Sequence, residues 1–260
     1  MIPKTIWQTH KFEYENLPGY ILAPILTWQH LNPGYEYKYS SNEECFDFVK
    51  DNFDKNIYDI FSYKNMSIRN RFDIWRILCI YHFGGIYADC DLFCMRPIDV
   101  FLDLGYDFIT KGSLDENKLC FSVGNDFLAS SQKSKAAEII IDKMMEECSK
   151  KIKSNHPIQT YHTGPPLYIG LYNEIFAKDS SLNFKLYEHN FGSEIIEQGV
   201  FDIVGSVTWN DIMDGTDFSY LNSIYSRYIE DDDYSVQNEI GWKHYHRLEI
   251  KASRKFSHGG

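Results

Sequence analysis

No long apolar run occurs in this sequence of 260 residues. A membrane-spanning helix needs about 18 or more consecutive apolar residues, and no stretch approaches that length. The N-terminus passes directly into a predicted strand, without the charged and apolar regions of a signal peptide. We therefore expect a soluble protein that acts in a cytoplasm.

Positive charge is scarce. The chain has 26 Lys and Arg residues against 37 Asp and Glu residues, which gives a formal net charge of −11. Nucleic-acid binding depends on clustered Lys and Arg that neutralise phosphates. Binding to an anionic membrane depends on a polybasic segment. We expect neither kind of partner.

Cysteine is present, but without the spacing of a metal site. The six cysteines fall partly within apolar runs, so we expect reduced core residues. Cys90 and Cys94 form a Cys-x-x-x-Cys pair, for which a redox role and simple packing are both open. Internal repeats, low-complexity tracts and obvious linkers are also lacking, which favours a single domain.

Strand-like and helical segments alternate along the chain. The predicted strands cover residues 4–8, 35–39, 86–89 and 107–110, and the predicted helices cover residues 43–53, 65–83 and 134–150. Ser41 and Glu44 have the spacing of a capping box, which supports the start of the first of these helices. Such alternation is typical of an α/β fold with a mainly parallel sheet flanked by helices. Residues from about 208 to 233 are acidic and irregular, and we expect a loop or lid there.

Residues 71–91 are the most informative segment. Apolar residues recur at helical spacing until Gly84 and Gly85, which supply the left-handed conformation that ends a helix. A short apolar strand follows, and Asp89 and Asp91 stand at its carboxyl end, where open α/β sheets bind ligands. Side chains two apart on an extended strand point to the same side, so both carboxylates can reach one ion. Such oxygen donors favour Mg²⁺ or Mn²⁺, with water and a nucleotide diphosphate as further ligands.

Charged residues interrupt the otherwise apolar helix before these glycines. Asp73 lies three residues before Arg76, and Arg69 lies seven before it, so all three share a face. Buried charges must pair with each other or meet a ligand. A simple ion pair beside a surface Asp-x-Asp turn is the alternative. The combined pattern D-x-x-R and G-G-x-Y-x-D-x-D is far more restrictive than Asp-x-Asp alone.

These residues resemble the DXD-containing sugar transferases of glycosyltransferase family 32, the group of the initiating α-1,6-mannosyltransferases. More distantly, they resemble the glucosylating domains of clostridial toxins. The similar blocks, in the family's order, are residues 2–8 (IPKTIWQ), Trp28, residues 32–37 (NPGYEY), Asp73, Arg76, residues 84–91 (GGIYADCD), residues 125–127 (NDF) and residues 163–165 (TGP). Together they cover most of residues 1–170.

The resemblance implies a GT-A fold, a Rossmann-like domain over residues 1–260. The nucleotide-sugar half is expected at about residues 1–130, and the acceptor half at about residues 131–260. The activity implied is that of a retaining hexosyltransferase with Mn²⁺ or Mg²⁺, a UDP- or GDP-sugar as donor and a glycan or other hydroxyl compound as acceptor. No carboxylate nucleophile is evident, which favours front-face attack in which the leaving phosphate takes the acceptor's proton. Relatives in the secretory pathway usually carry an N-terminal membrane anchor, and this sequence shows none.

The resemblance also implies roles for four catalytic residues. Asp91 is expected to bind the metal most directly, and Asp89 to contact metal-bound water or the ribose. Asp73 and Arg76 are expected to hold hydroxyls of the donor sugar, which fixes the anomeric carbon for attack. Metal at the two aspartates would neutralise charge on the leaving diphosphate.

The first strand is expected to contribute to the nucleobase site. Trp7, Gln8 and His10 lie there, and an aromatic ring can stack on a base. Relatives often have His at the position of Trp7, and Trp or Tyr at that of His10. Which ring stacks on the base is therefore open, as is simple core packing for Trp7.

The C-terminal third is expected to complete the site. Many GT-A enzymes take a third metal ligand there, often a His shortly before a Ser-Trp or Gly-Trp pair. Trp242 matches that pair and is expected near the donor phosphate, but the upstream position carries no His. His244 and His246 follow, either as metal ligands or as surface or acceptor-site residues. Thr163 lies in a turn that should lead into a helix at Leu167. Two interpretations of Thr163 are open: it contacts the donor or acceptor, or it is part of a rigid connector.

Two other classes of function stay open. A nucleotide-sugar hydrolase shares the acidic pair but needs a general base for water, and none is evident. A non-catalytic sugar-binding or interaction protein is the other alternative, against which the four charged residues argue. The Lys, Asn and Ile usage suits a low-GC bacterium or a large DNA virus that makes its own surface glycans. A viral enzyme would act in the host cytoplasm.

Overall fold

The computed structural model describes residues 1–17, 19–94, 97–188 and 200–201. The chain divides into two compact units. The first unit comprises Met1–Glu15, Gly34–Asp89 and Asp103–His189, and the second comprises Asn16–Pro33, Cys90–Leu102 and the remainder from Asn190. The division into a nucleotide half and an acceptor half near residue 130 stays a prediction.

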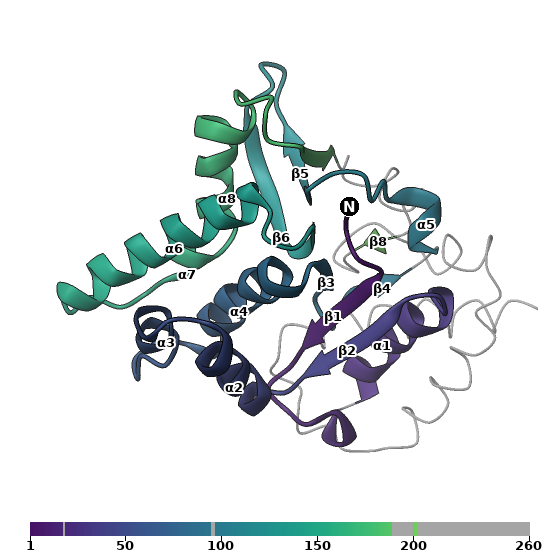
Figure 1. The fold of residues 1–260 in the computed structure, drawn as a ribbon, viewed down its shortest axis with the longest axis horizontal. Coiled ribbons are helices and arrows are strands. Elements are labelled where there is room, and N and C mark those ends of the chain that lie inside the picture. The colour runs from purple at the N-terminus through teal and green to yellow at the C-terminus, as the bar shows by residue number, and fades with distance from the viewer. Residues whose placement is uncertain (18, 95–96, 189–199, 202–260) are drawn as a thin grey trace, which may run out of the picture. The chain divides into compact units, whose positions relative to one another are not determined.

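A six-stranded mixed sheet forms the centre of the first unit, in the order β2-β1-β3-β6-β5-β7 (Figure 1). Its strands are β1 (Thr5–Thr9), β2 (Glu36–Ser40), β3 (Gly85–Ala88), β5 (Phe108–Leu114), β6 (Cys120–Ser130) and β7 (Phe184–Glu188). β1 runs parallel to β2 and β3, and β5 runs parallel to β7. Only β6 runs against its neighbours, β3 and β5, within this sheet. The predicted α/β fold with a mainly parallel sheet is therefore confirmed.

The first unit has helices at the three predicted segments, residues 43–53, 65–83 and 134–150, and further short helices at residues 55–61 and 160–163 that were not predicted. They are α2 (Asn42–Asn52), α3 (Lys55–Phe61), α4 (Ile68–Phe83), α6 (Lys135–Lys153), α7 (Thr160–Thr163) and α8 (Pro165–Leu171), with the 3-10 turn η1 (Tyr14–Asn16) and the π-helical turn η2 (Tyr172–Phe176). The predicted capping box is confirmed, since Ser41 N–H donates to Glu44 Oε2 at 2.8 Å and Ser41 Oγ accepts from Glu44 N–H. α8 begins at Pro165, two residues before the predicted Leu167, because proline suits the first helical turn.

Helix α4 is the central helix of this unit. Its residues 73–80 are buried without interruption, and it packs against α2, α6, β3 and β6. Burial on so many sides explains why residues 74–80 are apolar except for Arg76. The largest buried side chains of the core include Trp75 on α4 and Tyr87 on β3, whose rings meet edge to face at 6.3 Å. The helix thus carries its charged residues into the core.

Two glycines end α4 as predicted. Gly84 has a φ of 72° and Gly85 a φ of 109°, conformations that favour glycine. Space is equally restrictive, because a Cβ on Gly85 would lie 2.7 Å from the Thr5 carbonyl oxygen and 2.9 Å from Trp7 Nε1. The glycines therefore allow β3 to start immediately after the helix and to lie close against β1.

The second unit has its own small framework. Its described elements are α1 (Gly19–Leu31), β4 (Phe93–Cys94), α5 (Ile98–Phe101) and β8 (Val200–Phe201), with β4 antiparallel to β8. The Trp28 indole N–H donates to the Leu92 carbonyl at 2.8 Å, and the Cys94 N–H donates to Thr27 Oγ1 at 2.8 Å. Helix α1, which falls where the sequence pattern predicts no helix, thereby holds the segment that follows Cys90.

The cysteines are free and buried, as predicted. Burial raises the pKa of Cys148 to about 12 and that of Cys45 well above its usual range, so these thiols stay protonated at neutral pH. Within the ranges that the structure describes, no helix combines the length and the apolar character needed to cross a membrane.

Candidate functional site

Helix α4 brings two of the predicted site residues into the interior. Ser67 caps the helix by accepting the Asn70 N–H, and the helix then runs unbroken past Asp73 and Arg76. Asp73 is only 3% exposed and Arg76 only 6%. An ionised group at such a depth is costly unless charges and hydrogen bonds compensate it.

The Arg76 guanidinium lies at the centre of a charged cluster. Its Nη2 is 3.1 Å from Asp89 Oδ1 and 3.4 Å from Asp73 Oδ1. Its Nη1 donates to the Asn125 carbonyl at 2.6 Å, and its Cζ stands 4.8 Å from the centre of the Tyr87 ring. Burial lowers the pKa of Arg76, but the negative charges of Asp89 and Asp73, together with Tyr87, outweigh burial and raise it. The guanidinium therefore stays charged and links helix α4 to the end of β3.

Both carboxylate oxygens of Asp73 are hydrogen-bonded. Oδ1 accepts from Asn125 Nδ2 at 2.9 Å, and Oδ2 accepts from the Thr163 hydroxyl at 3.0 Å. Asn70 Nδ2 in turn donates to Thr163 Oγ1 at 2.8 Å. The carboxylate is thus held in one orientation by groups from β6 and α7. The sequence left two interpretations of Thr163 open, a rigid connector or a ligand contact. In the structure, its hydroxyl is hydrogen-bonded to Asp73.

Asp89 follows β3 at its carboxyl end, as predicted. Its N–H donates to the Asp126 carbonyl at 2.8 Å, and its own carbonyl accepts from Gln8 Nε2 at 3.2 Å. The Tyr87 hydroxyl donates to Asp89 Oδ1. The Asp89 side chain is 29% exposed, unlike those of Asp73 and Arg76. One edge of the charged cluster therefore reaches solvent at Asp89.

Strand β6 supplies residues that are absent from the predicted site. Thr110 pairs with Leu128 and the next residue, Lys111, pairs with Gly124, so a bulge occurs around residues 125–127. Bulges often reorient side chains beside binding sites. Here the bulge places Asn125 against Asp73, and Lys111 Nζ 2.6 Å from Asp126 Oδ2. The sequence signal for these residues was the block 125–127 (NDF), which resembles the family but was given no role in the sequence analysis.

One further residue faces the cluster from helix α8. Tyr168 is 2% exposed, and among the described residues its hydroxyl has no hydrogen-bond partner. Burial raises the pKa of Tyr168, and nearby Arg76 lowers it in part, so the hydroxyl is neutral. No motif pointed to Tyr168, which lies three residues after the TGP block.

The three residues of the first strand and its end have protein partners. Trp7 stacks on Phe83 with ring centres 5.1 Å apart, and its indole N–H donates to the Gly84 carbonyl at 2.9 Å. Gln8 is fully buried, and its Oε1 accepts from the Tyr37 hydroxyl at 2.9 Å. His10 is partly exposed and its ring meets Phe12 edge to face. A role for any of them at a nucleobase stays a prediction.

The remaining predicted residues are placed differently. Asp91 is exposed and belongs to the second unit, whereas Asp89 belongs to the first. Trp242, His244, His246 and the acidic segment 208–233 lie outside the described residues. Within the described part of the chain, no group of three or more His, Cys, Asp or Glu side chains is arranged to hold a metal ion. Two aspartates with phosphate and water ligands still fit the oxygen chemistry of Mg²⁺ and Mn²⁺.

The comparison with known families identifies this region. Residues 20–107 match the family described as a glycosyltransferase sugar-binding region containing a DXD motif. The match includes α4 with Asp73 and Arg76, and the pair Asp89 and Asp91. Residues 20–107 are therefore similar to a DXD sugar-binding region. The predicted resemblance is therefore confirmed.

Two curated relatives are similar to part of this chain. An uncharacterized glycosyltransferase of Acanthamoeba polyphaga mimivirus is 30% identical over 109 residues, which are 42% of this chain and 43% of the relative. An initiation-specific α-1,6-mannosyltransferase of Candida albicans is 27% identical over 101 residues, which are 37% of this chain and 26% of the relative. The aligned segments thus span less than half of either relative.

A solved structure supports the GT-A fold. The UDP-bound glycosyltransferase domain of the YGT toxin superposes with a TM-score of 0.51, over 71% of this chain and 79% of that domain, at 9% sequence identity. At that identity the likeness concerns the fold alone. The predicted fold class is confirmed on this comparison and on the mixed sheet with its flanking helices.

Proposed function

We propose that this chain is a metal-dependent retaining glycosyltransferase, which moves a hexose from a nucleotide diphosphate sugar to a hydroxyl group of a glycan or similar acceptor. The observation that carries the proposal is the buried cluster of Asp73, Arg76 and Asn125, which reaches solvent at Asp89. A cluster of this kind destabilises a core unless it is well compensated, and an apolar replacement is often at least as stable. Its presence at the end of a central strand favours a ligand-binding role.

The acidic pair is proposed to hold the metal. Asp89 and Asp91 would be its protein ligands, Asp91 most directly, and His244 or His246 is a candidate third ligand. Mn²⁺ or Mg²⁺ supplies positive charge that stabilises a departing diphosphate. Arg76 keeps Asp89 Oδ1 in place through the 3.1 Å contact, which limits reorganisation of the site when a donor binds.

Asp73 and Arg76 are proposed to position the donor sugar. A carboxylate fixed by Asn125 and Thr163 has one orientation, so it can accept hydrogen bonds from sugar hydroxyls at defined positions. Fixed orientation of the anomeric carbon lowers the entropic part of the barrier. In the front-face reaction, the acceptor oxygen bonds to the anomeric carbon while the bond to the diphosphate oxygen breaks, and the acceptor proton passes to the leaving phosphate.

The donor is proposed to be a UDP- or GDP-linked hexose. The Candida relative is named as a mannosyltransferase, which supports a hexose, and the YGT toxin domain was solved with UDP, which supports a uridine nucleotide. The base is proposed to lie near Trp7, Gln8 and His10, and Trp242 near the donor phosphate. Trp7 and Gln8 contact protein groups, the His10 ring contacts Phe12, and Trp7 and His10 are both partly exposed.

A thermal-shift panel tests this function. UDP-, GDP-, dTDP- and CMP-sugars are added with and without Mn²⁺, and the melting temperature is recorded. A ligand at about one hundred times its Kd stabilises the folded state by about 2.7 kcal/mol. For a chain of this size we expect a rise of roughly 5 to 10 °C for one base, in the presence of Mn²⁺ only.

Asp91→Asn is the decisive variant, with Asp51→Asn as its matched control. Asp51 is an exposed aspartate on α2, so its variant keeps binding and transfer unchanged. Asp91→Asn loses the Mn²⁺-dependent shift, and its transfer rate falls by about 100-fold or more. Release of free sugar at full rate without an acceptor would favour the hydrolase alternative. No shift with any nucleotide would favour a non-catalytic sugar-binding or interaction protein.

A further inference from the structure

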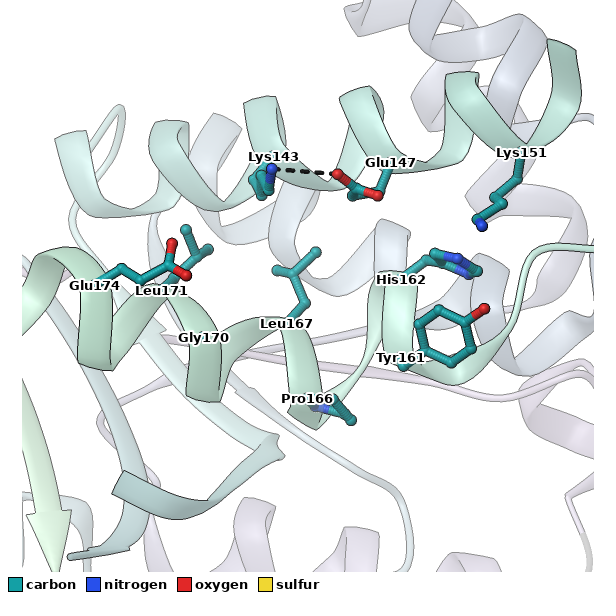
Figure 2. Close-up of a pocket in the computed structure, with 10 residues that line it drawn as sticks. All are labelled: Lys143, Glu147, Lys151, Tyr161, His162, Pro166, Leu167, Gly170, Leu171 and Glu174. Atoms are coloured by element: carbon teal, nitrogen blue, oxygen red, sulfur yellow. Dashed lines mark ion pairs between the residues drawn. The ribbon is translucent and has the colours of Figure 1, made fainter. Parts of the chain in front are cut away.

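A cavity lies in the first unit, between α6 and the short helices α7 and α8 (Figure 2). Its volume is about 240 Å³, and its polar lining residues are Lys143, Glu147, Lys151, Tyr161, His162 and Glu174. None of these belongs to the cluster around Arg76. Clefts for drug-sized ligands usually measure about 300 to 1,000 Å³, so this cavity suits a small group better than a whole nucleotide sugar.

His162 is a buried residue that lines this cavity. Its side chain is 2% exposed, and its Nδ1 accepts from the Gln159 N–H at 2.9 Å. Nδ1 also lies 3.2 Å from the Gln159 carbonyl oxygen, but the shorter contact is with the Gln159 N–H, which can only donate. We therefore assign the lone pair to Nδ1 and the ring proton of the neutral imidazole to Nε2. Among the described residues, the buried Nε2 has no partner. A buried donor without an acceptor destabilises the fold, so an acceptor in the cavity would stabilise it.

Lys151 is the cation beside this donor. Lys143 pairs with Glu146 and Glu147 on the same helix, whereas within the described ranges no carboxylate lies within ion-pair distance of Lys151. Figure 2 shows the Lys151 ammonium, the His162 ring and the Tyr161 hydroxyl together at one end of the cavity, with Glu174 at the other end. Burial and the Lys151 charge lower the pKa of His162 by more than the Gln159 backbone and the Glu147 charge raise it, which keeps the ring neutral at pH 7.

We propose that Lys151, His162 and Tyr161 form a binding site for an oxyanion, a phosphate or carboxylate group of a small ligand. The ammonium supplies the charge, and Nε2–H and the Tyr161 hydroxyl supply directed donors. A metal cation is disfavoured at this end, since Lys151 repels it and a protonated Nε2 has no lone pair for it. The Glu147 carboxylate does not occupy the anion position beside Lys151 and His162, because its Oε1 already pairs with Lys143 and Lys150. This site is independent of the proposed transferase reaction.

The test is an NMR titration of the wild-type chain with labelled histidine. Inorganic phosphate and acetate are added separately at constant ionic strength and pH, and the shifts of His162 Nε2 and Cε1 are followed. A saturable shift with at least one ion is expected. The ion that binds more tightly shows whether the site prefers a phosphate or a carboxylate group. Saturation by neither ion overturns the proposal.

Two variants locate the binding. Lys151→Gln is expected to lower the affinity for the more tightly bound ion about tenfold. Lys153 is an exposed lysine of the same helix outside the cavity, so Lys153→Gln should leave this affinity unchanged. Equal affinities of these two variants would refute the site. His162→Asn keeps an acceptor for the Gln159 N–H but lacks the Nε2 donor, and calorimetry should detect no binding to it. Undiminished binding by a folded His162→Asn would also refute the site.

Discussion

Helices α4 and α6 carry oppositely charged residues at the same spacing in opposite surroundings. On α4, Arg76 Nη2 and Asp73 Oδ1 are 3.4 Å apart, with side chains 7% and 4% exposed. On α6, Lys143 Nζ and Glu146 Oε2 are 3.2 Å apart, with side chains 41% and 50% exposed. Both pairs are separated by three residues along the helix. Spacing alone therefore does not reveal what a charged pair does.

The difference lies in the partners from other parts of the chain. The α6 pairs join residues of one helix and are surrounded by water, where ion pairs contribute little to stability. The α4 pair is completed by Asp89, Asn125 and Thr163, which come from three other segments. Surface charges on α6 serve solubility and local helix stability. The α4 charges form a cluster whose members depend on each other, as expected for a binding site.

Removal of the central cation should have the largest effect. Arg76→Met leaves two carboxylates, Asp73 and Asp89, without their shared positive charge. We expect a loss of about 3 to 5 kcal/mol in the free energy of unfolding, because the surviving charges stay desolvated. The melting temperature should fall by roughly 6 to 20 °C in differential scanning calorimetry.

Lys143→Met is the matched control on α6. It removes a positive charge from an exposed ion pair. We expect the free energy of unfolding to fall by no more than about 0.5 kcal/mol. Similar losses for Arg76→Met and Lys143→Met would contradict the distinction between the two helices.

Loss of one hydrogen bond to the cluster should have an intermediate effect. Thr163→Val keeps the shape of the side chain but removes the hydroxyl between Asp73 and Asn70. We expect a cost of about 1 to 3 kcal/mol from urea unfolding, since a buried acceptor and a buried donor lose their partner. Thr160→Val makes the same change at an exposed position of α7 and should stay close to the wild type. Equal stability of all three chains would show that the Thr163 hydroxyl is dispensable.

The smallest effect is expected for the α6 carboxylates. Hydrogen bonds from Lys150 lower the pKa values of Glu146 and Glu147 in the folded chain. A lowered folded pKa stabilises the fold above the unfolded pKa, and this contribution is lost as the pH falls through the folded pKa. The double variant Glu146→Gln, Glu147→Gln should therefore be slightly less stable at pH 7, with a difference that shrinks below about pH 4. Melting curves across this range measure it, and a difference that grows in acid would disprove the sign.

Short-range patterns predicted much of the fold. Helical periodicity placed α4 from residue 65 instead of 68, with the same end at Phe83. Gly84 and Gly85 marked its end, and the capping box marked the start of α2. Helix α1 escaped prediction, since Pro24 lies inside it and its sequence has little amphipathic pattern. β6 escaped because an antiparallel strand with a bulge breaks the regular alternation.

The site was predicted only in its local part. Asp73, Arg76 and Asp89 were recognisable because spacing along one helix and position after one strand are properties of neighbouring residues. Asn125 and Thr163 were not assigned to Asp73, from which they are separated by 52 and 90 residues. Tyr168 had no sequence signal at all.

By itself, the sequence determined the helix with two charges on one face, its glycine end, and an acidic pair after a short buried strand. These follow from backbone geometry and side-chain spacing over a few residues. Only the tertiary structure decided that the α4 charges are buried, which side chains compensate them, and that His162 meets Lys151 at a cavity. The physical reason is that the environment of a charge depends on every segment packed around it, and packing joins residues that are distant along the chain.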